Sequence, residues 1–399
     1  MKIWIKKVFG FGLASFFSDF SHEMTISFIP VVVGQFVGPA QIPFVLGIVA
    51  SVSDAFASFL RLTAGFLSDR LERKKPLIML GYAMSGLFST LLGFAHSVPM
   101  LLIYRMLSFA GSGLREPPRD AAMATVIEPE YYGRAFGLQR AMDTLGSLVG
   151  PLVALACIGI VSVKGIFVLS FIPGILSVLA IFFFTKDVVL PKKTSKFSPT
   201  LWADFAQLPR AFIVLLAILF IFDLSCFNKL LLLSRTQEIL PVTGSGSIGV
   251  AGWLVLLYAI FNFVRACSEF MIGLLSDYVN RILLLAVFGC GIFASVAFLL
   301  IPQHATFEQC ILIFVLSGLS AAAATTLKKA CAADMLPAEI RGLGFGVLQA
   351  TEGFAALISS ALIGFLWTAY SPLLGFSYVI VMSLIATVLL LGFAVYIRR

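Results

Sequence analysis

The chain contains the same short motif twice, about half its length apart. Residues 65–74 read GFLSDRLERK, and residues 273–281 read GLLSDYVNR. In each copy the motif ends one long apolar segment and precedes the next, and Asp69 and Asp277 are 208 residues apart (277 − 69 = 208). A hydrophobic chain made of two copies of one half is typical of membrane transporters in which one half rocks against the other.

Composition places the chain in a membrane. It has 399 residues, of which 60% are hydrophobic and 12% charged, whereas a soluble domain carries about 25% charged residues. Apolar runs of about 20 residues indicate many membrane spans and overrule a reading as two or three soluble domains. The six cysteines form no Cys-x-x-Cys pair, so we expect buried small side chains and neither a disulfide framework nor a zinc site.

We therefore expect an all-α membrane protein with twelve transmembrane helices. The predicted spans are residues 9–33, 43–67, 76–96, 98–121, 134–160, 165–185, 211–235, 248–275, 281–301, 307–330, 343–368 and 374–397. An even number of spans puts both termini on one side, and the first apolar run is expected to stay as a span and not to be cleaved.

The net charge of +8 is attributed to the orientation of the chain in the membrane and not to a nucleic-acid binding site. Only Lys164 and Arg235 fall in loops of the odd-to-even type. The other Lys and Arg residues outside spans fall in even-to-odd loops, the termini and the central loop, and these are predicted to be cytoplasmic. This assignment also takes in four residues that lie inside the ends of the predicted spans 98–121 and 307–330: Arg115, Arg119, Lys328 and Lys329.

A polar segment divides the two halves. Residues 186–210 are rich in Lys, Pro and Ser and lack a long apolar run, so they are expected to form a cytoplasmic linker. It would join an N-terminal six-helix bundle, 1–185, to a C-terminal six-helix bundle, 211–399. The repeat extends over both bundles in matched positions: Asp19 with Asp223, Asp54 with Asn262, Gly133 with Gly342, and Asp143 with Glu352.

These residues resemble the major facilitator superfamily over the whole chain. The segment from Gly65 to Lys74 is similar to that family's signature loop after the second span, with Glu72 in place of a usual Gly. Arg105 followed by Gly111-Ser-Gly113 resembles the family's motif in span four, and Gly146-x3-Gly150-Pro151 resembles the span-five motif of antiporters and exporters. The resemblance implies two pseudo-symmetric bundles, alternating access and export, and places the chain near a prokaryotic drug or metabolite antiporter-like subgroup.

Ionisable residues in spans are the candidates for coupling. Such residues are costly in lipid and usually face the bundle interior or a wet cavity. In the resembled fold spans 1, 4, 7 and 10 line the central cavity, so the candidates for proton coupling and substrate binding are Asp19, Glu23, Asp54, Arg105, Asp223 and Lys229. Asp19 and Glu23 are four residues apart and share one helix face. The structural alternative is a set of buried ion pairs, such as Asp19 or Asp54 with Arg105.

The acidic residues Asp143 and Glu352 are predicted at the interface of the bundles. A structural role is favoured for both, and Asp143 is expected to pair with Arg140 or Arg119. In the same motif region, Gly146, Gly150 and Pro151 are expected to allow close helix packing and a kink.

The repeated loop motif predicts a cytoplasmic gate. In the resembled family the motif carboxylate faces the start of a helix in the other bundle, where free N–H groups favour negative charge. Asp69 would meet span eleven near Gly342, and Asp277 would meet span five near Gly133. The gate candidates are Gly65, Asp69, Arg70, Arg73, Arg119 and Asp277, and plain loop topology is the alternative.

The sequence indicates a transporter and not an enzyme. It lacks a Walker lysine pattern, a Ser-His-Asp set and a His-x3-His cluster. We expect a monomeric, proton-coupled secondary transporter in the cytoplasmic (inner) membrane that exports a small molecule and needs no cofactor. The alternatives are uptake of a nutrient or iron-chelate, and transition-metal export through a site formed by Asp19, His22 and Cys226.

Overall fold

The structure, a computed structural model, describes residues 3–26, 28–38, 42–157, 160–185, 205–227, 229–240 and 249–397. In this part of the chain every regular element is a helix. The predicted linker, 186–210, lies mostly outside the described residues, and only its last six positions belong to them.

The N-terminal half contains six membrane passes. Its helices are α1 (Ile3–Ile26), α2 (Ile29–Val33), α3 (Ile42–Ser68), α4 (Lys75–Leu91), α5 (Val98–Val126), α6 (Tyr132–Cys157), α7 (Val163–Leu169) and α8 (Phe171–Phe184). Short 3-10 turns lie at Leu92–Phe94 and Pro129–Tyr131. The side chains of Ser97 and Ser162 accept hydrogen bonds from the first-turn amides of α5 and α7, which fixes where these helices begin.

The C-terminal half repeats the plan. Its helices are α10 (Arg210–Ser225), α11 (Lys229–Ile239), α12 (Gly249–Leu275), α13 (Arg281–Leu284), α14 (Ile292–Leu299), α15 (Phe307–Met335), α16 (Arg341–Ala369) and α17 (Pro372–Ile397). A π-helical stretch, Leu285–Gly291, joins α13 to α14, and a 3-10 turn lies at Ala338–Ile340. Thr306 and Gln309 form a capping box at the start of α15.

The predicted spans agree with these helices in order and number, but three of them are broken, one of these at Ser170 between α7 and α8. The first span ends at Ile26, and the chain continues in the short helix α2, which has Pro30 in its first turn. The seventh span ends at Ser225, and Cys226 adopts an extended conformation before α11 begins at Lys229. Among the described residues, eight helices are long and apolar enough to cross a membrane.

The prediction for four basic residues was wrong. Helices α5 and α15 continue to Val126 and Met335, beyond the expected ends at 121 and 330. Four residues counted with the cytoplasmic loops lie inside these helices and are buried in the protein: Arg115, Arg119, Lys328 and Lys329. Each carries a long side chain that turns inward to a polar partner and not outward to water.

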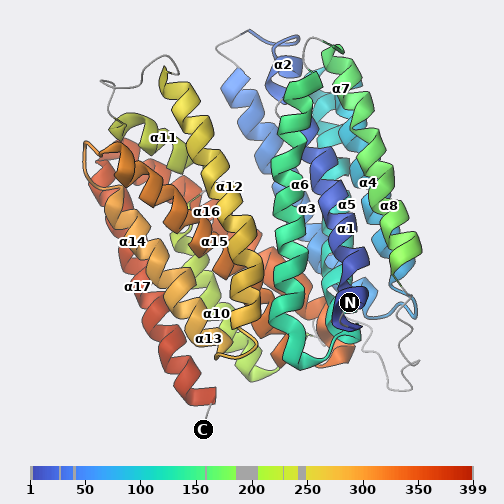
Figure 1. The fold of residues 1–399 in the computed structure, drawn as a ribbon, viewed down its shortest axis with the longest axis vertical. Coiled ribbons are helices and arrows are strands. Elements are labelled where there is room, and N and C mark those ends of the chain that lie inside the picture. The colour runs from blue at the N-terminus through green and yellow to red at the C-terminus, as the bar shows by residue number, and fades with distance from the viewer. Residues whose placement is uncertain are drawn as a thin grey trace.

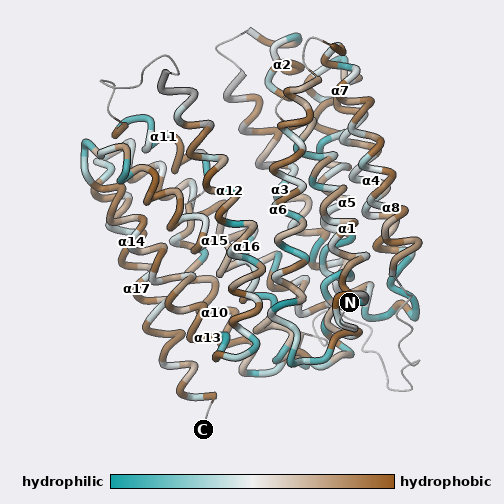
Figure 2. The backbone as a smooth tube through the Cα atoms, in the orientation of Figure 1, coloured by the Kyte–Doolittle hydropathy of each residue, from teal (hydrophilic) through white to brown (hydrophobic). Residues whose placement is uncertain are grey.

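The outer surface is apolar. Large hydrophobic side chains such as Phe183, Val388 and Phe263 are 60–69% exposed, which is the arrangement expected where lipid and not water is the solvent. Figure 2 shows hydrophobic residues along the helices and hydrophilic stretches gathered mainly at one end of the molecule.

We call this the basic end. It carries the loops after α3, α5, α12 and α15, with Lys7, Arg70, Lys74, Arg281 and Arg341. Helix α1 begins and helix α17 ends there (Figure 1).

The two halves meet along two equivalent helix pairs. Helix α3 packs on α16, and α6 packs on α12, so that green and blue helices lie against yellow and orange ones in Figure 1. Gly65 of α3 faces the backbone of Gly342, and Gly133 of α6 faces the backbone of Gly273. A side chain at either contact would meet a carbonyl group, so glycine is required for the backbones to approach.

Replacing Gly65 with alanine should therefore weaken the basic-end contact between the halves. The new methyl group would collide with the Gly342 backbone, which cannot move without shifting α16. We expect a lower melting temperature of the purified protein, and faster hydrogen exchange at the start of α16. Gly364→Ala is the control, because Gly364 lies on the partner helix α16 with open space around it and the substitution gains helix propensity of about 1 kcal/mol. Equal effects of the two substitutions would contradict the close-contact explanation.

Candidate functional site

The motif carboxylate of the N-terminal half contacts the opposite half. Asp69 directly follows α3, and its carboxylate accepts hydrogen bonds from the amides of Gly342 and Leu343 at 2.9 and 2.7 Å. Lys74 donates to the same carboxylate at 3.1 Å. Burial raises the pKa of Asp69 above its ordinary value, and Lys74 and the two amides act against that rise. These bonds bring Asp69 to the start of α16, the location expected from the motif.

Asp277 makes the equivalent contact with the other helix pair. Its carboxylate accepts from the amides of Gly133 and Arg134 at 2.9 and 3.2 Å, and from Nε of Arg134 at 2.5 Å. Arg281, on its own half, adds a bond of 3.0 Å. Two helix starts at the basic end are thus each bound by a carboxylate from the opposite half.

The arginines assigned to the gate have different roles. The guanidinium of Arg70 lies 3.4 Å from the ring centre of Phe66 on its own half. Arg73 is exposed. Arg119 is 2% exposed and bonds to Asp120, its own neighbour, and to Ser15 of α1. These bonds of Arg119 lie inside the N-terminal bundle and do not themselves cross to the other half.

Asp19 and Glu23 line a cavity between the halves. The cavity has a volume of about 390 Å³ and is bordered by Asp19, Glu23, Asp143, Thr144, Ser147, Lys229, Tyr258, Phe261, Asn262 and Arg265. Asp19 accepts a hydrogen bond of 3.2 Å from Ser147 on α6. Among the described residues neither Asp19 nor Glu23 forms an ion pair. Two carboxylates on one face of α1 are therefore available in this cavity.

Asp54 and Arg105 do not form the ion pair of the structural alternative. Asp54 is exposed on α3. Arg105 is 8% exposed, lies 4.7 Å from the ring centre of Phe109, and its Nη1 has no hydrogen-bond partner in the part of the chain that the structure describes. The structural alternative, in which Arg105 binds Asp19 or Asp54, is thus not formed among these residues.

The candidate residues of the C-terminal half, Asp223 and Lys229, have polar partners of their own. Asp223 forms an ion pair with Lys328 of α15, which lies 3.3 Å from Glu352 of α16. Lys229 donates to the hydroxyl of Tyr258 at 2.9 Å and does not pair with Asp223. Asp19 and Asp223 are counterparts in the repeat, yet only Asp223 has a cationic partner in the described structure.

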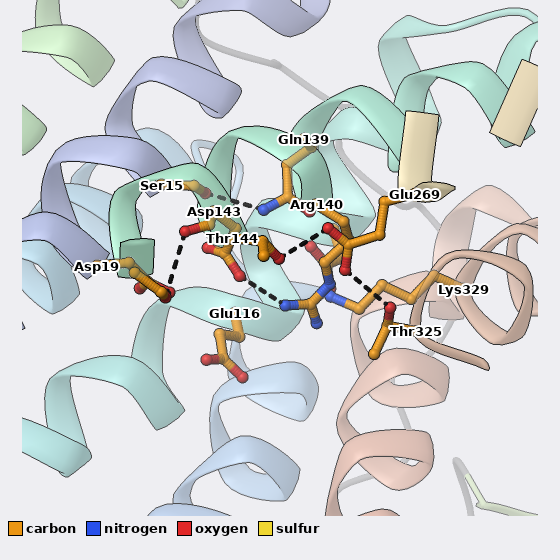
Figure 3. Close-up of polar contacts among 12 residues, drawn as sticks. Ser15, Asp19, Glu116, Gln139, Arg140, Asp143, Thr144, Glu269, Thr325 and Lys329 are labelled. Atoms are coloured by element: carbon orange, nitrogen blue, oxygen red, sulfur yellow. Dashed lines mark hydrogen bonds and ion pairs between the residues drawn. The ribbon is translucent and has the colours of Figure 1, made fainter. Parts of the chain in front are cut away.

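A polar network joins α6 to the other half near the cavity (Figure 3). Arg140 binds Asp143 at 2.8 Å, so that of the two expected partners of Asp143, Arg140 and Arg119, the first is the one found. The hydroxyl of Thr144 donates to Glu269 of α12 at 2.7 Å, and Glu269 also binds Arg265 at 3.1 Å. Asp143 is therefore held within its own helix, while Thr144 makes the contact across the interface.

The glycine motif of α6 packs against α1. Gly146 faces the backbone of Phe16, and Gly150 lies against Phe20 and Glu23. Pro151 lies inside the helix. This close packing holds α1 against α6, and with it the carboxylates that line the cavity.

The metal hypothesis receives no structural support. Among the described residues no three His, Cys, Asp or Glu side chains come together as a metal site. The ring of His22 packs edge-on against Phe109 with 5.3 Å between ring centres. Cys226 lies in the break between α10 and α11.

Sequence reasoning missed the ionic residues Asp120, Glu269, Lys328 and Lys329 as site residues. Asp120 and Lys329 form an ion pair that joins the halves. The available signal was position within a predicted span. Lys328 and Lys329 lie inside the predicted span 307–330, where a buried cation needs an acidic partner.

Comparison with known proteins identifies the family. The family model of the Major Facilitator Superfamily matches residues 11–240 and 237–399. The uncharacterized MFS-type transporter MJ1317 of Methanocaldococcus jannaschii is 28% identical over 388 residues, which is 97% of this chain and 94% of that protein. The multidrug resistance protein MdtH of Salmonella paratyphi B is 32% identical over 107 residues, 27% of this chain and 26% of MdtH.

The fold has a solved counterpart. The crystal structure of the human organic anion transporter MFSD10 superposes with a TM-score of 0.77 at 12% identity, covering 98% of this chain and 100% of that one. Its similarity supports the twelve-helix, two-bundle fold. The chain therefore belongs to the major facilitator superfamily, and it is a multi-pass membrane transporter of a small molecule and not an enzyme.

Proposed function

We propose that the protein is a proton-coupled secondary transporter that exports a small molecule by alternating access. The observation that carries the proposal is the pair of carboxylates on one face of α1. Asp19 and Glu23 line the cavity between the halves and have no ion-pair partner among the described residues. A carboxylate in such a place can exchange a proton when the cavity opens to a different compartment.

The asymmetry of the repeat supports Asp19 over Asp223 as the coupling residue. Lys328 holds Asp223 as part of a buried ion pair. The ammonium group of Lys328 favours the charged form of Asp223, whereas no such partner acts on Asp19 among the described residues. Among the described residues Asp19 accepts a hydrogen bond from Ser147 and has no cationic partner, and so keeps the freedom to change its protonation state.

The contacts of Asp69 and Asp277 supply a gate in this proposal. Both carboxylates bind helix starts of the opposite half at the basic end. The proposal assigns the basic end to the cytoplasm, in accordance with the positive-inside rule, and describes this conformation as closed on that side. Opening would require both sets of bonds to break, while the helices move as rigid bundles.

The export direction has separate support. The Gly146-x3-Gly150-Pro151 motif resembles that of antiporters, and the matched segment of MdtH belongs to a multidrug resistance protein. Uptake is the competing direction. Flux in proteoliposomes under inward and outward proton gradients distinguishes the two, with export requiring substrate to move against the direction of the proton.

Asp19→Asn should abolish coupling without preventing folding. We expect gradient-driven flux of a compound selected by thermal-shift binding to fall by about tenfold or more, because the substituted amide cannot carry the proton. Glu23→Gln tests the second carboxylate. The control is Glu308→Gln, an exposed position at the start of α15, which should retain normal flux. Normal coupling in both cavity variants and in their double mutant would remove Asp19 and Glu23 from this role.

Asp69→Asn should open the basic end more often. The amide keeps one acceptor oxygen but loses the charge that binds Lys74 and two helix amides, and hydrogen bonds to charged groups contribute about 1.5–3 kcal/mol. Hydrogen exchange at the amides of Gly342 and Leu343 should accelerate by about tenfold or more. Glu130→Gln, exposed at the same end, serves as control. Unchanged exchange in Asp69→Asn would exclude the gate role.

A further inference from the structure

Three contacts between the halves join a residue to its own counterpart in the repeat. Asp120 binds Lys329, and the hydroxyl of Tyr132 accepts from Arg341 at 2.7 Å, each pair being 209 residues apart. The rings of Phe136 and Phe345, at the same spacing, lie 5.8 Å apart. A two-fold rotation brings a position against its own copy only at the rotation axis. These pairs therefore mark the pseudo-two-fold axis near the basic end.

The ionic pair on this axis is completely enclosed. Asp120 is 0% exposed and Lys329 is 3% exposed. Asp120 also accepts a bond of 2.9 Å from Gln349 of α16 and one of 3.0 Å from Arg119 of α5. Two of the donors to this carboxylate, Lys329 and Gln349, thus belong to the opposite half and would leave together when the halves separate.

Because the two positions meet at the axis, the signs of their charges determine whether they attract or repel. Equal charges at an axis position would repel at short distance, whereas Asp120 and Lys329 carry opposite charges. Removing one partner of a buried ion pair leaves an uncompensated charge, which strongly destabilises the state in which it is enclosed. The closed basic end is that state, because opening admits water to either ion.

From this geometry we infer that Asp120 and Lys329, the axis pair, are a further conformational determinant of transport that holds the basic end closed. Asp69 and Asp277 act at the periphery and bind backbone amides. The axis pair acts at the centre, and it depends on two side chains that can be exchanged. The inference rests on the proposed alternating access, but it does not depend on proton coupling through Asp19 or Glu23.

The repeat also shows how the neighbouring cations are divided. Lys328 and Arg119 are counterparts beside the axis pair, and they hold different carboxylates: Lys328 binds Asp223, while Arg119 binds Asp120. Arg119 reaches Ser15 on α1, one helical turn from Asp19. Arg119 thus binds both Asp120 and α1, and so connects the axis pair to the helix that carries Asp19.

The test measures the opening of the basic end and not transport. Spin labels are placed at the exposed counterparts Glu130 and Glu339, in a background without the native cysteines and in lipid nanodiscs. Distance distributions are compared for the parent, D120N, K329Q, the like-charge variant K329D, and the exchange variant D120K/K329D. Because the two positions are equivalent, the exchange rebuilds the same pair in the opposite orientation.

We expect the population with separated basic ends to rise by about tenfold or more in D120N and K329Q, within the usual range of conformational coupling. It should rise further in K329D and return toward the parent value in D120K/K329D. In K329R, which keeps the positive charge, the basic end should remain closed. This variant replaces the exchange variant as the test if D120K/K329D does not fold. A K7Q variant controls for loss of a lysine, because Lys7 pairs with Glu128 on the same half.

Two outcomes would overturn the inference. One is an unchanged distance distribution in D120N and K329Q. The other is an exchange variant, or K329R, that opens as far as the neutral variants, since the pair would then contribute no specific ionic contact. Loss of proton coupling in Asp19→Asn with normal behaviour of the axis variants, or the reverse, separates this inference from the proposed function.

Discussion

The structure depends on the close approach of two helix pairs at glycine contacts. Gly65 against Gly342, and Gly273 against Gly133, let the backbones of opposite halves touch at the basic end. Only at this separation can the carboxylates of Asp69 and Asp277 reach the first amides of α16 and α6. Since those amides have no partner within their own helices, the contact satisfies groups that would otherwise need water. Packing and hydrogen bonding therefore form together and are lost together when the halves separate.

Charge within the bundles follows the repeat but does not copy it. Each half places an acidic residue on its first membrane span, Asp19 on α1 or Asp223 on α10. Each half also places a cation on its fourth span, Arg119 on α5 or Lys328 on α15. In the C-terminal half these two groups bind each other. In the N-terminal half the cation is drawn to Asp120 on the axis. The result is one neutralised carboxylate and one that lines a cavity, and a duplicated fold thereby obtains two different sites from equivalent positions.

Much of the fold could be predicted from the sequence, since long apolar runs can form only spans. The order of the spans was recovered, and the repeated motif located the contacts of Asp69 near Gly342 and of Asp277 near Gly133. The breaks after Ile26 and Ser225 were missed, because apolar residues continue across both. Asp19 and Glu23 were found since they lie deep in an apolar run, where an ionisable residue stands out.

The ionic network could not be predicted in the same way. Lys328 and Lys329 lie near the end of the predicted span 307–330, where a pair of lysines is easily counted with the loop that follows. The pairing of Asp120 with Lys329 depends on the position of the pseudo-two-fold axis, which is a property of the packed halves and not of local sequence. Arg105 illustrates the opposite case. An ion pair with Asp19 or Asp54 was the structural alternative for this residue, but its side chain lies over Phe109.

The central claim is that protonation of the carboxylates on α1 changes which compartment the cavity faces. The most direct measurement is the distance distribution between spin labels at residues 130 and 339. It is recorded in nanodiscs across a pH series, with the cavity residues unchanged. The account predicts that the ratio of separated to closed basic ends changes with pH, and that this change disappears when Asp19 and Glu23 are both replaced by their amides. A ratio that does not change with pH, or one that still changes in the doubly substituted protein, would contradict it.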